Sequence, residues 1–129
     1  MKKVLIIGKR GFIGCSLAKY LKRFYNIKHI SFKDLNKFKF KIYNFNFIIN
    51  TSINKNYIIN KYSEKFDNDL KISKLIDNKK TIYTFISTRK VYPSKANLME
   101  NTKLLPKSNY SKNKIITEQK LSKILKNNL

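Results

Sequence analysis

Residues 4–14 of this chain read VLIIGKRGFIG, and this stretch decides the fold. The four apolar residues at its start are typical of a buried parallel strand. Glycines follow at positions 8, 11 and 14, and a helical pattern begins directly after them. A turn of this kind lets backbone N–H groups at a helix N-terminus approach a pyrophosphate. The Gly-x-x-Gly-x-x-Gly spacing is a variant of the dinucleotide-binding fingerprint, although three glycines can also make a simple tight connection.

Strands and helices alternate along the rest of the chain. Further strands are predicted over residues 28–32, 45–50 and 81–86. Helical periodicity predicts helices over residues 12–24, 63–78 and 109–126. Residues 38–42 alternate as in a strand, but residues 33–45 give no clear assignment. Ser108 is placed to cap the last helix. The alternation predicts an α/β fold with a Rossmann-like, doubly wound parallel sheet.

The composition is strongly basic. Lysine and arginine total 29 against 7 acidic residues, a formal net charge of +22. The lysines are spread along the chain and form no block, so we interpret them as general solvated positions. A nucleic-acid-binding role therefore rests on charge alone.

The scarcity of cysteine and histidine indicates the redox compartment and the capacity to bind a metal. Cys15 is the only cysteine and His29 the only histidine, which excludes an intramolecular disulfide and gives no metal-ligand cluster. No apolar stretch is long enough to cross a bilayer. We expect a cytoplasmic protein without a metal.

Three features meet at the carboxyl ends of the predicted strands, where ligands bind in open α/β sheets. They are the glycine loop, Thr88 after the strand 81–86, and a pair on the last helix, Tyr110 and Lys114. An ammonium ~4 Å from a phenolate at an effective dielectric of ~20 attracts it by about 4 kcal/mol, up to roughly three pKa units. Tyr110 is therefore a candidate general acid/base. In a chain so rich in lysine, this spacing also arises by chance.

The order and spacing of these motifs resemble the extended short-chain dehydrogenase/reductase family, the NAD-dependent epimerases and dehydratases of nucleotide sugars. The resemblance runs from Lys3 to about Leu125. The matching residues are Gly8, Gly11, Gly14, the strand and its end at 47–52, Asn68, Ser87, Thr88, Val91, Tyr92, Glu100, Pro106, Tyr110, Lys114 and Glu118.

The resemblance implies a set of site residues. Tyr110 would exchange a proton with a sugar hydroxyl or ketone, Lys114 would hold the nicotinamide ribose and lower the Tyr110 pKa, and Thr88 would position the substrate oxygen. Asn68 is left out of this catalytic set because it often supports the family's site structurally. The residues implied in binding NAD or NADP are Gly8, Arg10, Gly11, Phe12, Ile13, Gly14, Asp34, Thr51 and Lys114.

Several positions depart from the family's pattern. Arg89 and Lys90 stand where the dehydratases carry Asp-Glu, which favours an epimerase or a reductase. Arg10 and Lys33 favour the phosphate of NADP, whereas Asp34 favours NAD, so both cofactors stay open. Family members are far longer and grip the sugar nucleotide with a C-terminal portion. We therefore expect residues 1–129 to form one Rossmann domain that is incomplete at its C-terminus, with strand 81–86 at an open edge.

The sequence thus predicts the N-terminal part of an NAD(P)-dependent epimerase or reductase that acts on a nucleotide sugar. The alternatives are a non-catalytic dinucleotide-binding module and a basic nucleic-acid-binding protein. Family members often pair through the helices that match residues 63–78 and 109–126, which predicts a homodimer.

Overall fold

A four-stranded parallel sheet forms the centre of the molecule. The computed structural model describes residues 1–38, 42, 44–77 and 80–129. The strands are β1 (Lys3–Ile7), β2 (Asn26–Ile30), β3 (Phe47–Asn50) and β4 (Ile82–Thr84), in the order β2-β1-β3-β4. β1 pairs in parallel with both β2 and β3. The predicted α/β fold with a Rossmann-like parallel sheet is confirmed.

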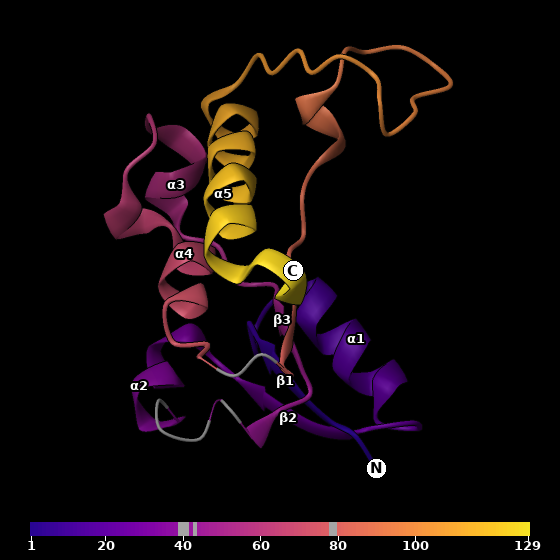
Figure 1. Ribbon diagram of the computed structural model, residues 1–129, viewed down its shortest axis with the longest axis vertical. Helices are drawn as coiled ribbons and strands as arrows, with labels where there is room; N and C mark the ends of the chain where they lie inside the picture. The colour runs from indigo at the N-terminus through magenta and orange to yellow at the C-terminus, as the bar shows by residue number, and fades with distance from the viewer. Residues whose placement is uncertain (39–41, 43, 78–79) are drawn as a thin grey trace.

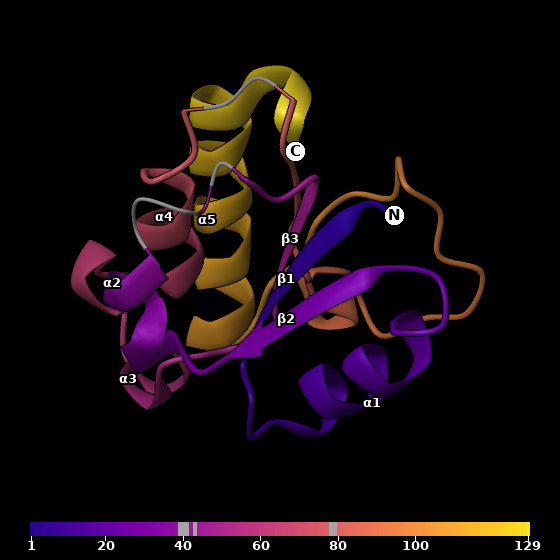
Figure 2. The ribbon, with the colours of Figure 1, turned by 90° about the horizontal axis from the view of Figure 1, so that it is seen from below.

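Helices cover the two faces of the sheet unequally. The α-helices are α1 (Phe12–Leu21), α2 (Leu35–Phe38), α3 (Lys55–Ile59), α4 (Asn68–Ser73) and α5 (Asn109–Leu125). Short 3-10 segments lie at η1 (Phe32–Asp34), η3 (Glu64–Phe66), η4 (Arg89–Val91) and η5 (Lys126–Asn128). α1 lies alone on one side of the sheet, and α3, α4 and α5 lie on the other (Figures 1 and 2).

The hydrophobic core lies between the sheet and the larger helical layer. Alternate strand residues point to that side and are buried, among them Leu5, Ile48 and Tyr83. Ile72 of α4 and Leu121 of α5 pack against them. Each fully buried Leu or Ile contributes about 1.5–3 kcal/mol relative to an exposed one, so this layer holds most of the apolar stabilisation.

The other face of the sheet, on the side of α1, becomes more exposed from β1 toward β4. Val4, Phe47 and Ile82 form one row across β1, β3 and β4; Val4 is 2% exposed, Phe47 is half-buried and Ile82 is 45% exposed. α1 packs against β1 and β2. The apolar face predicted for residues 12–24 is only partly used, because Tyr20 of α1 and Phe24 beyond its end remain more than half exposed.

The prediction of one continuous helix over residues 63–78 is wrong. Asp67 has an extended backbone (φ −87°, ψ 97°) that separates η3 from α4, and its carboxylate accepts the Leu70 amide at 2.9 Å as the N-cap of α4. An aspartate that binds a nearby backbone N–H competes with the helix it would otherwise continue. Asp67 is also fully buried, whereas the helical pattern places it on a solvent-facing stripe.

Other boundaries differ by a few residues. α1 ends at Leu21, three residues before the predicted end, and β2 begins at Asn26 because that residue pairs with Lys3. The Ser108 cap is confirmed: its hydroxyl oxygen accepts the Ser111 amide at 3.1 Å, and the Ser111 hydroxyl accepts the Ser108 amide at 3.2 Å. The strand-like alternation over residues 38–42 falls largely outside the described residues. Within the described part of the chain, every helix is too short or too polar to cross a membrane.

β4 lies at one end of the sheet order, which allows a test by hydrogen exchange. The Ile82 amide donates to Asn46 O at 2.9 Å on the β3 side, so strand alternation turns the Tyr83 amide to the other side. We expect the Tyr83 amide to exchange faster than the Leu5 amide in the central strand. Equal, strong protection of both amides in a monomer would mean that the edge is covered.

Candidate active site

The glycine loop joins the end of β1 to the start of α1 and is anchored to β2. The amides of Gly8 and Lys9 both donate to Ile30 O, at 2.8 and 3.1 Å, and the Gly11 amide donates to Gly8 O at 3.2 Å. Gly8 has φ +120°, which an L side chain rarely adopts. The loop conformation is therefore set by the chain itself.

Packing explains two of the three glycines. A Cβ at Gly8 would collide with the Thr51 hydroxyl, and one at Gly14 would collide with Gly8 O. Thr51 is held beneath the loop because its amide and its hydroxyl both donate to Ile7 O, at 2.8 and 2.9 Å. Thr51 thus packs against the loop and supports it, and its predicted contact with the cofactor stays a prediction.

Gly11 is different. A Cβ there would meet only Gly8 O, at an ordinary 3.7 Å. Neither the backbone angle of Gly11 (φ −80°) nor its surroundings within the chain require a glycine. The absence of a side chain at this position therefore leaves room for something that approaches from outside the chain.

The first turn of α1 presents donors beside that space. The amides of Phe12 and Ile13 precede the first intrahelical bond, which runs from Cys15 N to Gly11 O at 3.0 Å, and Gly11 has no side chain to cap them. Such amides at the positive end of a helix favour a phosphate. The Phe12 side chain is 87% exposed, and Arg10 is exposed in the loop. These residues fit the pyrophosphate of a dinucleotide.

Asp34 lies just beyond β2, as predicted. Its carboxylate accepts the Ser31 hydroxyl at 2.5 Å and pairs with Lys37 at 3.4 Å. The Ser31 hydrogen bond is the main cause that holds the pKa of Asp34 below its usual value. Asp34 is thus charged and locally engaged, and Lys33 beside it is exposed. The choice between NAD and NADP stays open at this position.

Lys114 is buried at the end of β4. Its ammonium donates to Ile86 O at 2.8 Å and lies 3.7 Å from a carboxylate oxygen of Asp69, an ion pair too long for a hydrogen bond. Both side chains are 7% exposed. Aromatic rings also surround the ammonium, with centroids at 4.7, 5.8 and 5.9 Å for Phe85, Tyr57 and Tyr110.

Tyr110 lies one turn before Lys114 on α5. Its ring packs edge-on against Tyr57 at 6.5 Å, and its hydroxyl makes no hydrogen bond to a described residue. Burial, and after it the negative charge of Asp69, raises the pKa of Tyr110. Burial lowers the pKa of Lys114, while Asp69 opposes that shift. The Tyr110 pKa is thus raised and not lowered as expected, although the Lys114 ammonium lies 5.9 Å from its ring centroid.

Thr88 caps η4 and lies between two cavities. Its hydroxyl accepts the Lys90 amide at 3.3 Å, and α5 packs against η4, which brings Thr88 to the same end of the sheet as Tyr110 and Lys114. Within the part of the chain that the structure describes, no hydrogen bond joins the hydroxyls of Thr88 and Tyr110. The structure therefore gathers the three predicted catalytic residues in one region without joining all of them.

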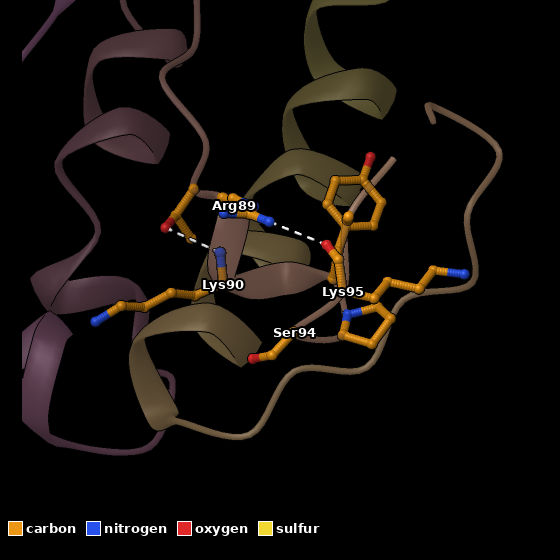
Figure 3. A pocket seen from close by; sticks show the side chains of 8 residues that line it. Arg89, Lys90, Ser94 and Lys95 are labelled. Atoms are coloured by element: carbon orange, nitrogen blue, oxygen red, sulfur yellow. Dashed lines mark hydrogen bonds between the residues drawn. The ribbon is translucent and has the colours of Figure 1, made fainter. Parts of the chain in front are cut away.

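The two cavities beside Thr88 differ in charge. One, of about 680 Å³, is lined by Arg89, Lys90 and Lys95, and the Arg89 guanidinium donates to Lys95 O at 3.0 Å across it. Figure 3 shows the two lysine side chains extending to opposite sides of this cavity. The other, of about 510 Å³, is lined by Glu100 and Glu118 and shares Arg89 with the first. Carboxylates suit sugar hydroxyls, so the pair of cavities offers both charge types to a substrate.

The sequence interpretation missed a network of buried polar side chains beneath this region. Asp69 accepts the Asn50 amide at 2.9 Å and the Tyr83 hydroxyl, and Asp67 accepts the hydroxyls of Thr117 and Tyr62 at 2.7 and 2.8 Å. The available signal was that four of the seven acids, Asp67 and Asp69 among them, lie within the predicted helical segment 63–78. Asn68, kept out of the predicted catalytic set, donates to the Ser52 hydroxyl at 3.1 Å and so supports the loop after β3.

The two halves of the site meet at the end of β3. Asn50 holds Asp69, and its neighbour Thr51 holds the glycine loop. Because all four strands are parallel, the glycine loop, Thr51 and Ile86 leave the same edge of the sheet. The predicted cofactor residues and the predicted catalytic residues therefore line one edge.

Solved structures share this fold. The chain superposes on a dTDP-4-dehydrorhamnose reductase from Clostridium acetobutylicum with a TM-score of 0.71 and 22% identity, over 95% of this chain and 49% of that one. It also superposes on a dTDP-glucose 4,6-dehydratase from Bacillus anthracis in complex with NAD, with a TM-score of 0.68 and 17% identity, over 95% and 51% of the two chains. The fold is that of one half of these enzymes.

A UDP-N-acetylglucosamine 4-epimerase from Bacillus cereus gives a TM-score of 0.67 at 16% identity, over 98% of this chain and 56% of that one. The chain thus spans about half the length of the solved structures it matches. No family model and no curated protein matches the sequence. The resemblance predicted from the motifs is confirmed at the level of the fold.

Proposed function

We propose that this chain is the NAD(P)-binding part of an epimerase or reductase that acts on a nucleotide sugar. The observation that carries the proposal is Gly11, the one loop glycine that the packing of the chain does not require. Beside it, the amides of Phe12 and Ile13 are positioned for a phosphate. Likeness of fold to a reductase, a dehydratase and an epimerase of nucleotide sugars supports the choice of substrate class.

In this proposal the chain's residues divide the work between binding and proton transfer. The loop from Gly8 to Gly14 binds the pyrophosphate, Asp34 or Arg10 contacts the adenosine ribose or its phosphate, and Lys114 contacts the nicotinamide ribose. The bound nicotinamide supplies hydride transfer. Tyr110 gives or takes the proton of the sugar oxygen, and Thr88 orients that oxygen. The cavity next to Thr88 that is lined by Glu100, Glu118 and Arg89 receives sugar hydroxyls.

Cofactor binding is tested by Gly11→Val. We expect the NAD(P) dissociation constant to rise at least about tenfold, because the new side chain fills the space that the pyrophosphate needs. The free energy of unfolding should change by only about 1 kcal/mol or less, since the site tolerates a Cβ. Isothermal titration calorimetry and thermal unfolding measure the two effects.

Ser16→Val is the matched control, because Ser16 is exposed on α1 and receives the same β-branched side chain. It should leave the dissociation constant unchanged. Equal NAD(P) affinity in wild type and folded Gly11→Val would contradict the proposal, as would failure of the wild-type chain to bind either cofactor.

Proton transfer is tested by Tyr110→Phe, with a nucleotide sugar as substrate and with the chain joined to a substrate-binding portion. We expect turnover to fall about 100-fold or more, the usual contribution of a general acid/base, while cofactor affinity is retained. Tyr20→Phe, an exposed tyrosine on α1, is the control. Full turnover in Tyr110→Phe would assign the proton to another group.

We also propose that two copies of the chain associate through the predicted pair of helical regions, residues 63–78 and α5, with the half-buried Ile116 of α5 in the contact and α3 beside it. Ile58 and Ile59 of α3 and Ile124 of α5 are each at least 40% exposed, and the Asn109 side chain joins α5 to Ile59 O at 2.9 Å. Ile116→Lys should weaken self-association, whereas Ser16→Lys adds the same charge on α1 and should not. Sedimentation velocity over a range of concentrations measures this, and a wild-type monomer at high concentration would exclude the dimer.

A further inference from the structure

Asp69 is a buried acid for which the proposed function has no role. It lies on α4 opposite Lys114 of α5, and its two carboxylate oxygens have separate partners. Oδ1 accepts the Asn50 amide at 2.9 Å and the Tyr83 hydroxyl, and Oδ2 faces the Lys114 ammonium at 3.7 Å. The carboxylate is thus fixed by two strands while it pairs with a helix.

The partners of Lys114 confine its positive charge. The ammonium has the Ile86 carbonyl on one side, the Asp69 carboxylate on another and the rings of Phe85, Tyr57 and Tyr110 around it. A cation between a carboxylate and aromatic faces is stabilised where it lies and exerts little net field beyond its partner.

The Lys114–Asp69 pair also bears on the pKa of Tyr110. The titratable groups packed around the Lys114–Asp69 pair are Tyr57 of α3, Asp67 at the start of α4, Tyr83 of β4 and Tyr110 itself on α5. Of the charged groups, Asp69 is the one that acts on Tyr110, and it acts together with burial to raise its pKa. The net shift of the Tyr110 pKa is thus upward, with burial as its larger cause, although the Lys114 ammonium lies 5.9 Å from the Tyr110 ring centroid.

We propose that Asp69 is a positioning residue that holds the Lys114 ammonium against the end of β4 and cancels its effect on Tyr110. Neutralising Asp69 releases the ammonium and activates the phenol. The inference deepens the proposed function, because it names what regulates the proton-transfer residue of that same site. A ligand that binds the Lys114 ammonium in place of Asp69 has the same effect on Tyr110.

The test is Asp69→Asn in the full chain without cofactor or substrate. Asparagine has nearly the same shape, and its carbonyl oxygen still accepts from Asn50 and Tyr83. The Tyr110 pKa is measured from ¹³Cζ-tyrosine NMR spectra, with the signal assigned by its loss in Tyr110→Phe. We expect that pKa to fall by about one unit, the effect of removing a nearby negative charge and freeing a positive one.

Asp67→Asn is the matched control. Asp67 is as deeply buried, lies two residues away and accepts hydroxyls from Tyr62 and Thr117, but it does not contribute to the Tyr110 pKa. It should lower thermal stability and leave the Tyr110 titration in place. If Asp69→Asn does not fold, Asp69→Ser removes the same charge with a smaller side chain.

An unchanged Tyr110 pKa in a folded Asp69 variant overturns the inference, and so does an equal shift in Asp67→Asn. Because the titration needs no ligand, its outcome is separate from that of the proposed function. A wild-type chain that binds no NAD(P) contradicts the proposed function, while a lowered Tyr110 pKa in Asp69→Asn still establishes the pairing.

Discussion

Two buried carboxylates, Asp67 and Asp69, connect most of the elements that form the site. Asp67 caps α4 and receives the Thr117 hydroxyl from α5, while Asp69 receives side chains from β3 and β4 and pairs with Lys114 of α5. Because Thr117 donates to Asp67, the Tyr57 hydroxyl must donate to Thr117 at 2.6 Å, which adds α3 to the same network. The helical layer is thus fixed in register with the strand ends.

The value of such a network is geometric more than energetic. Replacing a buried ion pair with apolar groups is often neutral, but removing one partner costs about 3–5 kcal/mol because a buried charge is left alone. That is a large fraction of the roughly 5–15 kcal/mol by which a domain is stable. The network therefore tolerates little change at any single member, and it holds Lys114, Tyr83 and Asn50 in one arrangement.

The sequence predicts the elements of this fold better than their electrostatics. All four strands were predicted near their observed positions; β1 and β3 are apolar runs, as buried parallel strands usually are, whereas β2 carries exposed Asn26 and Lys28. The helix predicted over residues 63–78 failed at Asp67, where a side chain and not the hydrophobic period decides the backbone. The spacing of Tyr110 and Lys114 correctly places both on one side of α5, yet their pKa shifts depend on burial and on Asp69, which lies on another helix.

The glycine pattern likewise does not tell which glycines the packing of the chain requires, and the structure supplies this distinction. The fingerprint treats the glycines at 8, 11 and 14 alike, whereas packing against Thr51 and Gly8 O accounts for the first and the last. Gly11 is separated from them only when the surroundings of each absent Cβ are known.

Composition gives a further reason to read the buried acids as functional. A chain with 29 basic and 7 acidic residues uses lysine at most solvated positions, so each acid is a departure from its general pattern. Two of the seven are withdrawn from a surface on which they would reduce the repulsion among the lysines, and that withdrawal increases the positive charge outside. Asp67 is accounted for by the helix cap it forms. Asp69 caps nothing; its partners are Asn50 at the end of β3, Tyr83 within β4 and the lysine beside Tyr110, and the proposed positioning role rests on this arrangement.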